Sequence, residues 1–197
     1  MNFKKMKNKY FIFRHGNSEA NIENLIISDL DSGVLSYGLT EFGIKQVEMS
    51  INDLISKNSI KNPVVVASPF KRTVETATII CNKLNIKTPI INDKLRERYF
   101  GKFNISDSIN YEKIWSMDVM DPESSIWGVE SVNEVSERLH KLFVELEDQY
   151  NNSNIILVSH GDPLQILECM VSGKNIGEHR SINPINQGEY RKLIIRI

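Results

Sequence analysis

Three short segments of this chain place arginine or histidine directly after a run of apolar residues. The first is Arg14-His15-Gly16, which follows the apolar, aromatic residues 10–13. Histidine can act as a nucleophile or carry a proton near neutral pH, and arginine presents a planar fork of donors to phosphate or carboxylate. A glycine there lets the backbone turn tightly and approach a ligand. Taken alone, such a tripeptide is more often structural than catalytic, so the rest of the chain must supply partners.

The second segment follows the β-branched residues 63–67 and begins Ser68-Pro69. Serine before proline predicts a helix start, with Ser68 as the N-cap and Pro69 in the first helical position. Arg72 then lies near a helix end that favours anions, which indicates an anion site. A solvated surface arginine would explain the same residue.

The third segment, residues 159–163, follows the apolar residues 154–158 and contains His160 and Gly161. Its Asp162-Pro163 pair again predicts a helix start, here with Asp162 as the N-cap. Glu97 is a further candidate because it lies between Arg96 and Arg98. Such a carboxylate is usually part of a surface ion-pair cluster, but in a phosphate pocket it could donate a proton.

The elements that must position these side chains alternate between strand and helix. Strands are predicted at residues 10–13, 63–67, 88–91, 154–158 and 189–195, and helices at residues 40–55, 69–84, 111–117, 131–146 and 162–171. This alternation predicts a three-layer α/β sandwich in which a mostly parallel central sheet has helices on both faces. The carboxyl ends of parallel strands lie at one edge, so Arg14, His15, Arg72 and His160 are expected to meet there.

Two segments lack clear periodicity and are predicted to be loops near that edge. They are residues 21–38 and residues 102–128, and the second also contains the short predicted helix. Long loops in compact domains are usually functional or mobile. Trp115 and Trp127 lie in the second segment and are expected to pack against the core rather than to form a lid.

Composition limits the classes of partner. The 197 residues suffice for one core, so residues 1–197 are predicted to form a single catalytic domain, and the net charge of −1 argues against nucleic acid or an anionic membrane as partner. No apolar run is long enough for a signal peptide or a membrane span. Cys81 and Cys169 have no metal-like spacing and are expected to be reduced in a cytoplasmic protein.

Two arginines and two histidines at one sheet edge suit a multiply charged anion, and a phosphate monoester matches their donors. The sequence contains no glycine-rich P-loop with its lysine and no evident acidic cluster for magnesium. We therefore expect metal-free chemistry in which a side chain accepts the phosphoryl group directly.

Five motifs support a family resemblance: Arg14-His15-Gly16 with Asn21, Leu39-Thr40-Glu41-Phe42-Gly43 with Gln46, Ser68-Pro69-Phe70-Lys71-Arg72-Thr73 with Thr76-Ala77, Glu97-Arg98-Tyr99-Phe100-Gly101, and Ser159-His160-Gly161. In this order, over nearly the whole chain, they resemble the histidine phosphatase superfamily, which includes the cofactor-dependent phosphoglycerate mutases. The resemblance implies the phosphoglycerate mutase-like fold and a phosphoric monoester hydrolase that acts on a small phosphorylated metabolite.

The resemblance also implies roles for individual residues. His15 would attack phosphorus and become a phosphohistidine, while Arg14, Arg72 and His160 would hold the phosphoryl oxygens. Glu97 would protonate the leaving oxygen and then deprotonate water. The substrate-binding residues would be Asn21, Ser68 and Gly161. The resemblance implies neither a metal nor a cofactor, and it is compatible with a homodimer.

Departures from the family pattern favour the phosphatase branch. Residues 102–130 are short for a mutase and lack a tandem-arginine, proline-rich stretch, and Gly128-Val129-Glu130-Ser131 resembles a phosphatase Gly-Glu-Ser motif with one residue inserted. The alternative is a phosphoglycerate mutase, which would require 2,3-bisphosphoglycerate as cofactor. A third reading is a catalytically silent binding member, although the intact catalytic motifs argue against it. The natural substrate stays open.

Overall fold

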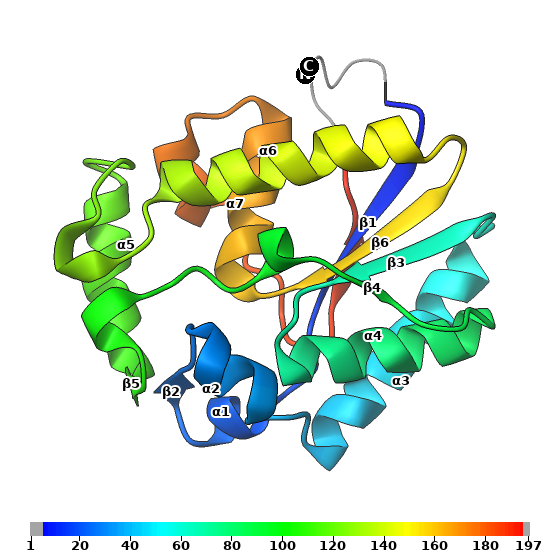
Figure 1. The fold of residues 1–197 in the computed structure, drawn as a ribbon, viewed down its shortest axis with the longest axis horizontal. Coiled ribbons are helices and arrows are strands. Elements are labelled where there is room, and N and C mark those ends of the chain that lie inside the picture. Colours follow the sequence, from blue (N-terminus) through cyan, green and yellow to red (C-terminus); the bar gives the residue numbers. More distant parts are fainter. Residues whose placement is uncertain (1–5, 195–197) are drawn as a thin grey trace.

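The computed structural model describes residues 6–194 and contains a five-stranded sheet in the order β4-β3-β6-β1-β7 (Figure 1). The strands are β1 (Lys9–Arg14), β3 (Pro63–Ala67), β4 (Ile90–Ile91), β6 (Asn154–Ser159) and β7 (Tyr190–Lys192). The first four are parallel, and β7 pairs antiparallel with β1. The predicted mostly parallel sheet is therefore confirmed. The predicted last strand is shorter than expected at both ends, and its final residue, Ile195, lies outside the described residues.

Helices cover both faces of the sheet, which confirms the predicted three layers (Figure 1). Helices α3 (Glu41–Lys57) and α4 (Lys71–Leu84) lie on one face, and α6 (Val132–Gln149) and α7 (Gly161–Ser172) lie on the other. Each face has its own buried apolar cluster. Strand β6 is the middle strand of the five and is buried along its whole length, which explains the apolar run of its residues 155–158.

A smaller layer of short elements flanks the carboxyl edge of the sheet. It contains α1 (Glu19–Ile22), β2 (Leu25–Ile26), α2 (Leu30–Leu35), β5 (Ser106–Asp107) and α5 (Tyr111–Asp118). Strands β2 and β5 pair antiparallel, and a separate apolar cluster around Phe100 and Ile26 lies beneath them. The prediction of a long loop over residues 21–38 was wrong, because pairing between two distant segments cannot be seen in local periodicity. The short helix predicted at residues 111–117 is confirmed.

Tight 3₁₀ turns complete the chain path. They span Asp93–Leu95, Gly101–Phe103, Ser108–Asn110, Ile126–Gly128 and Ile176–Ser181. The last of these, together with residues up to Gln187, returns the chain to the carboxyl edge before β7.

Two of the four predicted helix N-caps are confirmed and two are wrong. Thr40 caps α3 by accepting from the Gly43 N–H, and Ser131 forms a capping box with Glu134 at the start of α6. The predicted caps Ser68 and Asp162 are both wrong, because α4 begins at Lys71 and α7 begins at Gly161. Both side chains instead bind other residues at the carboxyl edge.

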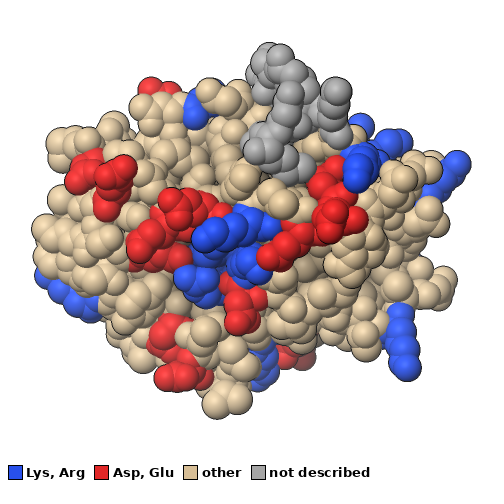
Figure 2. Space-filling view, turned by 45° about the horizontal axis from the view of Figure 1, so that its top comes forward, with Lys and Arg blue, Asp and Glu red and all other residues tan. Residues whose placement is uncertain are grey.

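The surface agrees with the near-neutral charge. Figure 2 shows lysine and arginine side chains in the centre of one face with aspartate and glutamate around them, so this face has no broad field of one sign. Among residues 6–194, no helix is long and apolar enough to cross a membrane. Cys81 and Cys169 are buried free thiols, as expected for reduced cysteines.

Candidate active site

The predicted gathering of basic residues at the carboxyl edge is present. Arg14 ends β1 and pairs in register with Ser159 of β6, which places His15 beside His160. The two imidazole ring centroids are 5.3 Å apart. Arg72, from the first turn of α4, donates to both rings. Four side chains from three segments that are far apart in the sequence therefore form one cluster.

The hydrogen bonds of His15 define its protonation state. Its Nδ1 lies 2.7 Å from the Gly16 carbonyl oxygen, which can only accept, so Nδ1 carries the proton. Its Nε2 accepts from Arg72 Nε at 3.2 Å and therefore keeps a lone pair. Burial lowers the pKa of His15 well below its usual value, and the charges of Arg72 and Arg14 lower it further. The ring is thus held neutral, with its proton on Nδ1.

Arg14 and Arg72 each keep one buried donor without a partner. Arg14 Nη1 donates to the Ile185 carbonyl at 2.9 Å and Arg72 Nη2 donates to the Ile27 carbonyl at 3.0 Å, but Arg14 Nε and Arg72 Nη1 bond to none of the described residues. A buried guanidinium nitrogen without an acceptor costs free energy. An anion beside His15 would satisfy both nitrogens.

His160 occupies the centre of the cluster in its neutral form. Its Nδ1 accepts from Arg72 Nη2 at 3.0 Å, so its Nε2 carries the proton and donates to Ser68 Oγ at 2.9 Å. Burial lowers its pKa well below the usual range, and Arg72 contributes further. Ser68 is fully buried and does not line the cavity. Its hydroxyl contacts His160, and its predicted contact with the substrate stays a prediction.

Glu97 faces the cluster from the segment between β4 and the small layer. Its Oε1 accepts from the Arg98 N–H at 2.9 Å, and its Oε2 lies 3.8 Å from His160 Nδ1. Burial, followed by the negative charge of Asp162, raises the pKa of Glu97 to about 7. A carboxyl group with this pKa can donate and accept protons near neutral pH.

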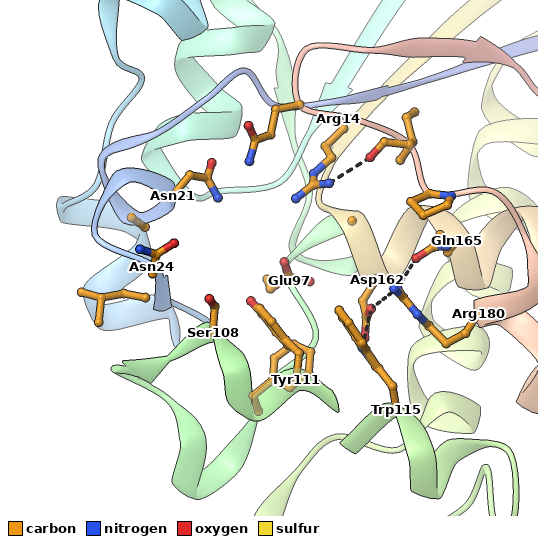
Figure 3. A pocket seen from close by; sticks show the side chains of 17 residues that line it. Arg14, Asn21, Asn24, Glu97, Ser108, Tyr111, Trp115, Asp162, Gln165 and Arg180 are labelled. Carbon is orange, nitrogen blue, oxygen red and sulfur yellow. Dashed lines mark hydrogen bonds and ion pairs between the residues drawn. The ribbon is translucent and has the colours of Figure 1, made fainter. Parts of the chain in front are cut away.

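Arg14 and Glu97 line a cavity of about 330 Å³ at the carboxyl edge (Figure 3), whereas His15, Arg72 and His160 are buried and are not among its lining residues. Arg14, Asn21, Glu97 and Gly161 line it, so Asn21 and Gly161 lie where substrate-binding residues were predicted. A Cβ on Gly161 would lie 3.3 Å from Arg14 Cζ, which is tighter than most such contacts. Gly161 thus lets α7 begin against the guanidinium.

Comparison with known proteins decides the family. Residues 10–195 match the histidine phosphatase superfamily (branch 1). The chain belongs to the histidine phosphatase superfamily. It is similar to phosphoserine phosphatase 1 of Hydrogenobacter thermophilus, with 24% identity over 96% of this chain and 91% of that protein. It is 30% identical to a Cronobacter sakazakii protein named "Probable phosphoglycerate mutase GpmB", over 82% of this chain and 72% of that protein.

The fold is shared with solved structures. One is a phosphoserine phosphatase variant from Entamoeba histolytica in complex with phosphoserine, with a TM-score of 0.75 and 22% identity over 96% of this chain and 91% of that chain. The named relatives of this histidine phosphatase chain thus include both phosphatases and a mutase.

Several cavity residues of this histidine phosphatase chain were not singled out as substrate contacts from the sequence. They are Asn24, Ser108, Tyr111, Trp115, Gln165, Arg180 and Gln187. Trp115 was expected only to pack; it lines the cavity, and its Nε1 donates to Asp162 Oδ1 at 3.1 Å. Trp127 does pack, against Phe103.

Buried ion pairs lie next to the cavity residues Asp162 and Glu97. Arg98 is fully buried and donates to both oxygens of Asp118, at 2.6 and 2.7 Å, and to Asp162 Oδ2 at 3.3 Å. Glu130 accepts from Arg96 at 2.6 Å and from Arg138 at 2.8 Å, so it belongs to an ion-pair cluster behind Glu97. Within residues 6–194, no group of three histidine, cysteine, aspartate or glutamate side chains is placed to hold a metal ion.

Gly16 has a packing role in the structure. A Cβ on Gly16 would lie 2.4 Å from the Gly43 carbonyl oxygen, and one on Gly43 would lie 2.0 Å from the Asn17 carbonyl oxygen. The two glycines let the turn after β1 lie directly against the start of α3. This contact fixes the backbone next to His15.

Proposed function

We propose that this protein is a metal-independent phosphomonoesterase that hydrolyses a small phosphorylated metabolite through a phosphohistidine on His15. The observation that carries the proposal is the pair of unpartnered buried nitrogens, Arg14 Nε and Arg72 Nη1, beside an imidazole whose Nε2 keeps its lone pair. The nitrogens offer a phosphoryl group two donors, and Nε2 offers it a nucleophile.

In the first step, the hydrogen bond from Arg72 Nε to His15 Nε2 is released, Nε2 attacks phosphorus with the lone pair thus freed, a P–N bond forms and the P–O bond to the leaving group breaks. Arg14 and Arg72 balance the charge of the equatorial oxygens in the transition state. Glu97, protonated because of its raised pKa, gives its proton to the leaving oxygen. The bound dianion also favours protonation of His160 Nδ1, which converts that atom from acceptor to donor.

In the second step, a water molecule attacks the phosphohistidine. The Glu97 carboxylate takes a proton from the water, an O–P bond forms, and the P–N bond breaks. His15 returns to its neutral form and inorganic phosphate leaves. The step uses the same two groups in reversed roles, so Glu97 is again protonated for the next turnover.

Hydrolysis is favoured over a mutase reaction by the segment that covers the cavity. Residues 102–128 contain two lysines and no arginine, and neither lysine lines the cavity. The cations among the described lining residues are Arg14 and Arg180. Residues 102–128 themselves therefore contribute no cation to the cavity, in contrast to the tandem-arginine stretch expected of a mutase.

A two-channel assay tests this proposal. The enzyme is incubated with EDTA and a panel of phosphomonoesters, including 3-phosphoglycerate with a trace of 2,3-bisphosphoglycerate, while free phosphate and 2-phosphoglycerate are followed separately. We expect phosphate release that the His15→Ala variant loses. Rapid formation of 2-phosphoglycerate with little phosphate would identify a mutase, and dependence of phosphate release on added metal would contradict the metal-free mechanism.

A further inference from the structure

Arg180 lines the cavity as the end member of a stack of flat groups. Its Cζ lies 3.6 Å from the centroid of the Trp115 ring, and that ring is nearly parallel to Tyr111, with centroids 5.0 Å apart. Figure 3 shows Trp115 between Tyr111 and Arg180. The adjacent His179 is fully buried and anchors the backbone. Arg180 is therefore held in one place although its side chain is 25% exposed.

Most hydrogen-bonding capacity of Arg180 remains unused. Its Nη1 donates to Asp162 Oδ1 and to Gln165 Oε1, whereas Nε and Nη2 bond to no residue within 6–194. A planar guanidinium with free donors at a cavity wall is suited to a carboxylate or phosphate group. Burial lowers the pKa of Arg14, and repulsion from the charge of Arg180 makes a smaller contribution in the same direction. Negative charge between them would relieve that repulsion.

The cavity offers no comparable site to a cationic group. Asp162 accepts hydrogen bonds from Arg98, Arg180 and Trp115, so both of its oxygens are already engaged. Glu97, the other carboxyl group among the described lining residues, has its pKa raised to about 7 and faces the reacting phosphoryl group. An ammonium group on the substrate would therefore find no free carboxylate.

From the unused donors of Arg180 and its fixed place in the stack, we infer that Arg180 is a specificity-determining residue. It binds a second anionic group, carboxylate or phosphate, on the leaving-group part of the substrate. The inference rests on the proposed phosphatase activity and narrows its substrate class to phosphorylated acids and bisphosphates. The phosphoryl group to be removed lies at Arg14 and Arg72, and the second anion lies at Arg180. Tyr111 and Trp115 flank the space between them.

Binding calorimetry in a His15→Ala background tests this inference without depending on turnover. Two pairs of probes differ mainly in the second anion: 3-phosphoglycerate with glycerol 3-phosphate, and fructose 1,6-bisphosphate with fructose 6-phosphate. We expect the member that carries the second anionic group to bind at least about tenfold more tightly in at least one pair, as a charged hydrogen bond allows. The pair with the larger ratio identifies carboxylate or phosphate as the group bound.

The variant Arg180→Gln should reduce that ratio to below about threefold, and Arg180→Lys, which keeps the charge but loses the fork, should retain part of it. Lys102→Gln is the matched control, because Lys102 also lies over a tryptophan, Trp127, at 4.4 Å but does not line the cavity. It should leave the ratio as in the parent. A residue that only holds Asp162 in place would weaken both members of a pair equally.

The outcomes separate this inference from the proposed function. No preference for the second anion in either pair, or a preference that survives in Arg180→Gln, would overturn the role of Arg180 and leave hydrolysis untouched. A preference lost in Arg180→Gln, combined with no phosphate release by the wild type, would support the anion site and overturn the phosphatase.

Discussion

Burial shifts the pKa values of His15 and Glu97 in opposite directions. Removing a charged group from water favours its neutral form, so the pKa of the imidazole falls and that of the carboxyl group rises. Near neutral pH this gives an unprotonated nucleophile beside a carboxyl group that is still partly protonated. The same physical effect thus prepares both partners of the proposed first step, with Arg14 and Arg72 adding to it at His15.

The acid role of Glu97 is tested by changing the leaving group. We expect Glu97→Gln to lower kcat/KM for alkyl phosphates by about 100- to 10,000-fold, because their alkoxide needs a proton as it leaves. For 4-nitrophenyl phosphate, whose leaving group is stable as an anion, the loss should stay within about tenfold. Steady-state kinetics with both substrates measure this difference, and equal losses would show that Glu97 is not the general acid.

At the scale of the element, Asp162 in the first turn of α7 affects the pKa of Glu97. The sequence predicts Asp162 as a helix cap, but its side chain points to Arg98, Arg180 and Trp115 and contributes to the raised pKa of Glu97. Helix starts rich in aspartate usually stabilise the helix. Here the carboxylate instead adds negative charge beside the acid.

The pH dependence of the reaction follows from this placement. Glu97 donates a proton only below its pKa of about 7, so kcat/KM for an alkyl phosphate should fall as the pH rises above 7. Asp162→Asn removes a charge that raises this pKa, and the fall should then begin at a lower pH. Ionisation of the substrate is the same for both enzymes and does not affect the comparison.

A matched control is Asp118→Asn, since Asp118 pairs with the same Arg98 but is not among the charges that shift the pKa of Glu97. This variant should keep the wild-type pH at which the rate falls. A profile for Asp162→Asn that coincides with the wild-type profile would contradict the proposed electrostatic link between α7 and Glu97.

Elements with strong local signals could be predicted from the sequence. The apolar runs of β1, β3 and β6, the Ser131 capping box and the sheet-edge position of Arg14, His15, Arg72 and His160 all follow from local patterns and parallel topology. The caps at Ser68 and Asp162 were wrong because each side chain found a tertiary partner, His160 or Arg98, that local sequence does not reveal.

The side of the cavity formed by Tyr111, Trp115 and Arg180 could not be predicted for the same reason. Tyr111 and Trp115 lie on α5, Arg180 lies in the turn before β7, and their contacts depend on how the small layer packs at the sheet edge. The pairing of β2 with β5 positions that layer, and each strand is only two residues long. An aromatic pair spaced four residues apart in a short helix was the one available signal.

At the scale of the whole molecule, two apolar clusters hold the sheet between its helical layers. Leu139 of α6 is fully buried in one of them, whereas Val144 on the same helix is 44% exposed. We expect Leu139→Ala to reduce the free energy of unfolding by about 2–5 kcal/mol, because it leaves a cavity in a close-packed core. Denaturant unfolding measures this change.

Val144→Ala is the matched control and should change the free energy of unfolding by no more than about 0.5 kcal/mol. Similar losses for the two variants would mean that Leu139 does not pack in a buried apolar cluster between α6 and the sheet.

The proposed mechanism depends on a phosphoryl group carried by His15. Rapid acid-free quenching with ³²P-labelled substrate tests for this intermediate most directly. We expect the wild type to retain label that is labile to acid and stable to base, as a phosphoramidate should be. His15→Ala should abolish the label, while a control variant of His140, which lies on α6 outside the cavity, should keep it. Label that persists in His15→Ala, or its absence from a wild type that releases phosphate, would contradict the account.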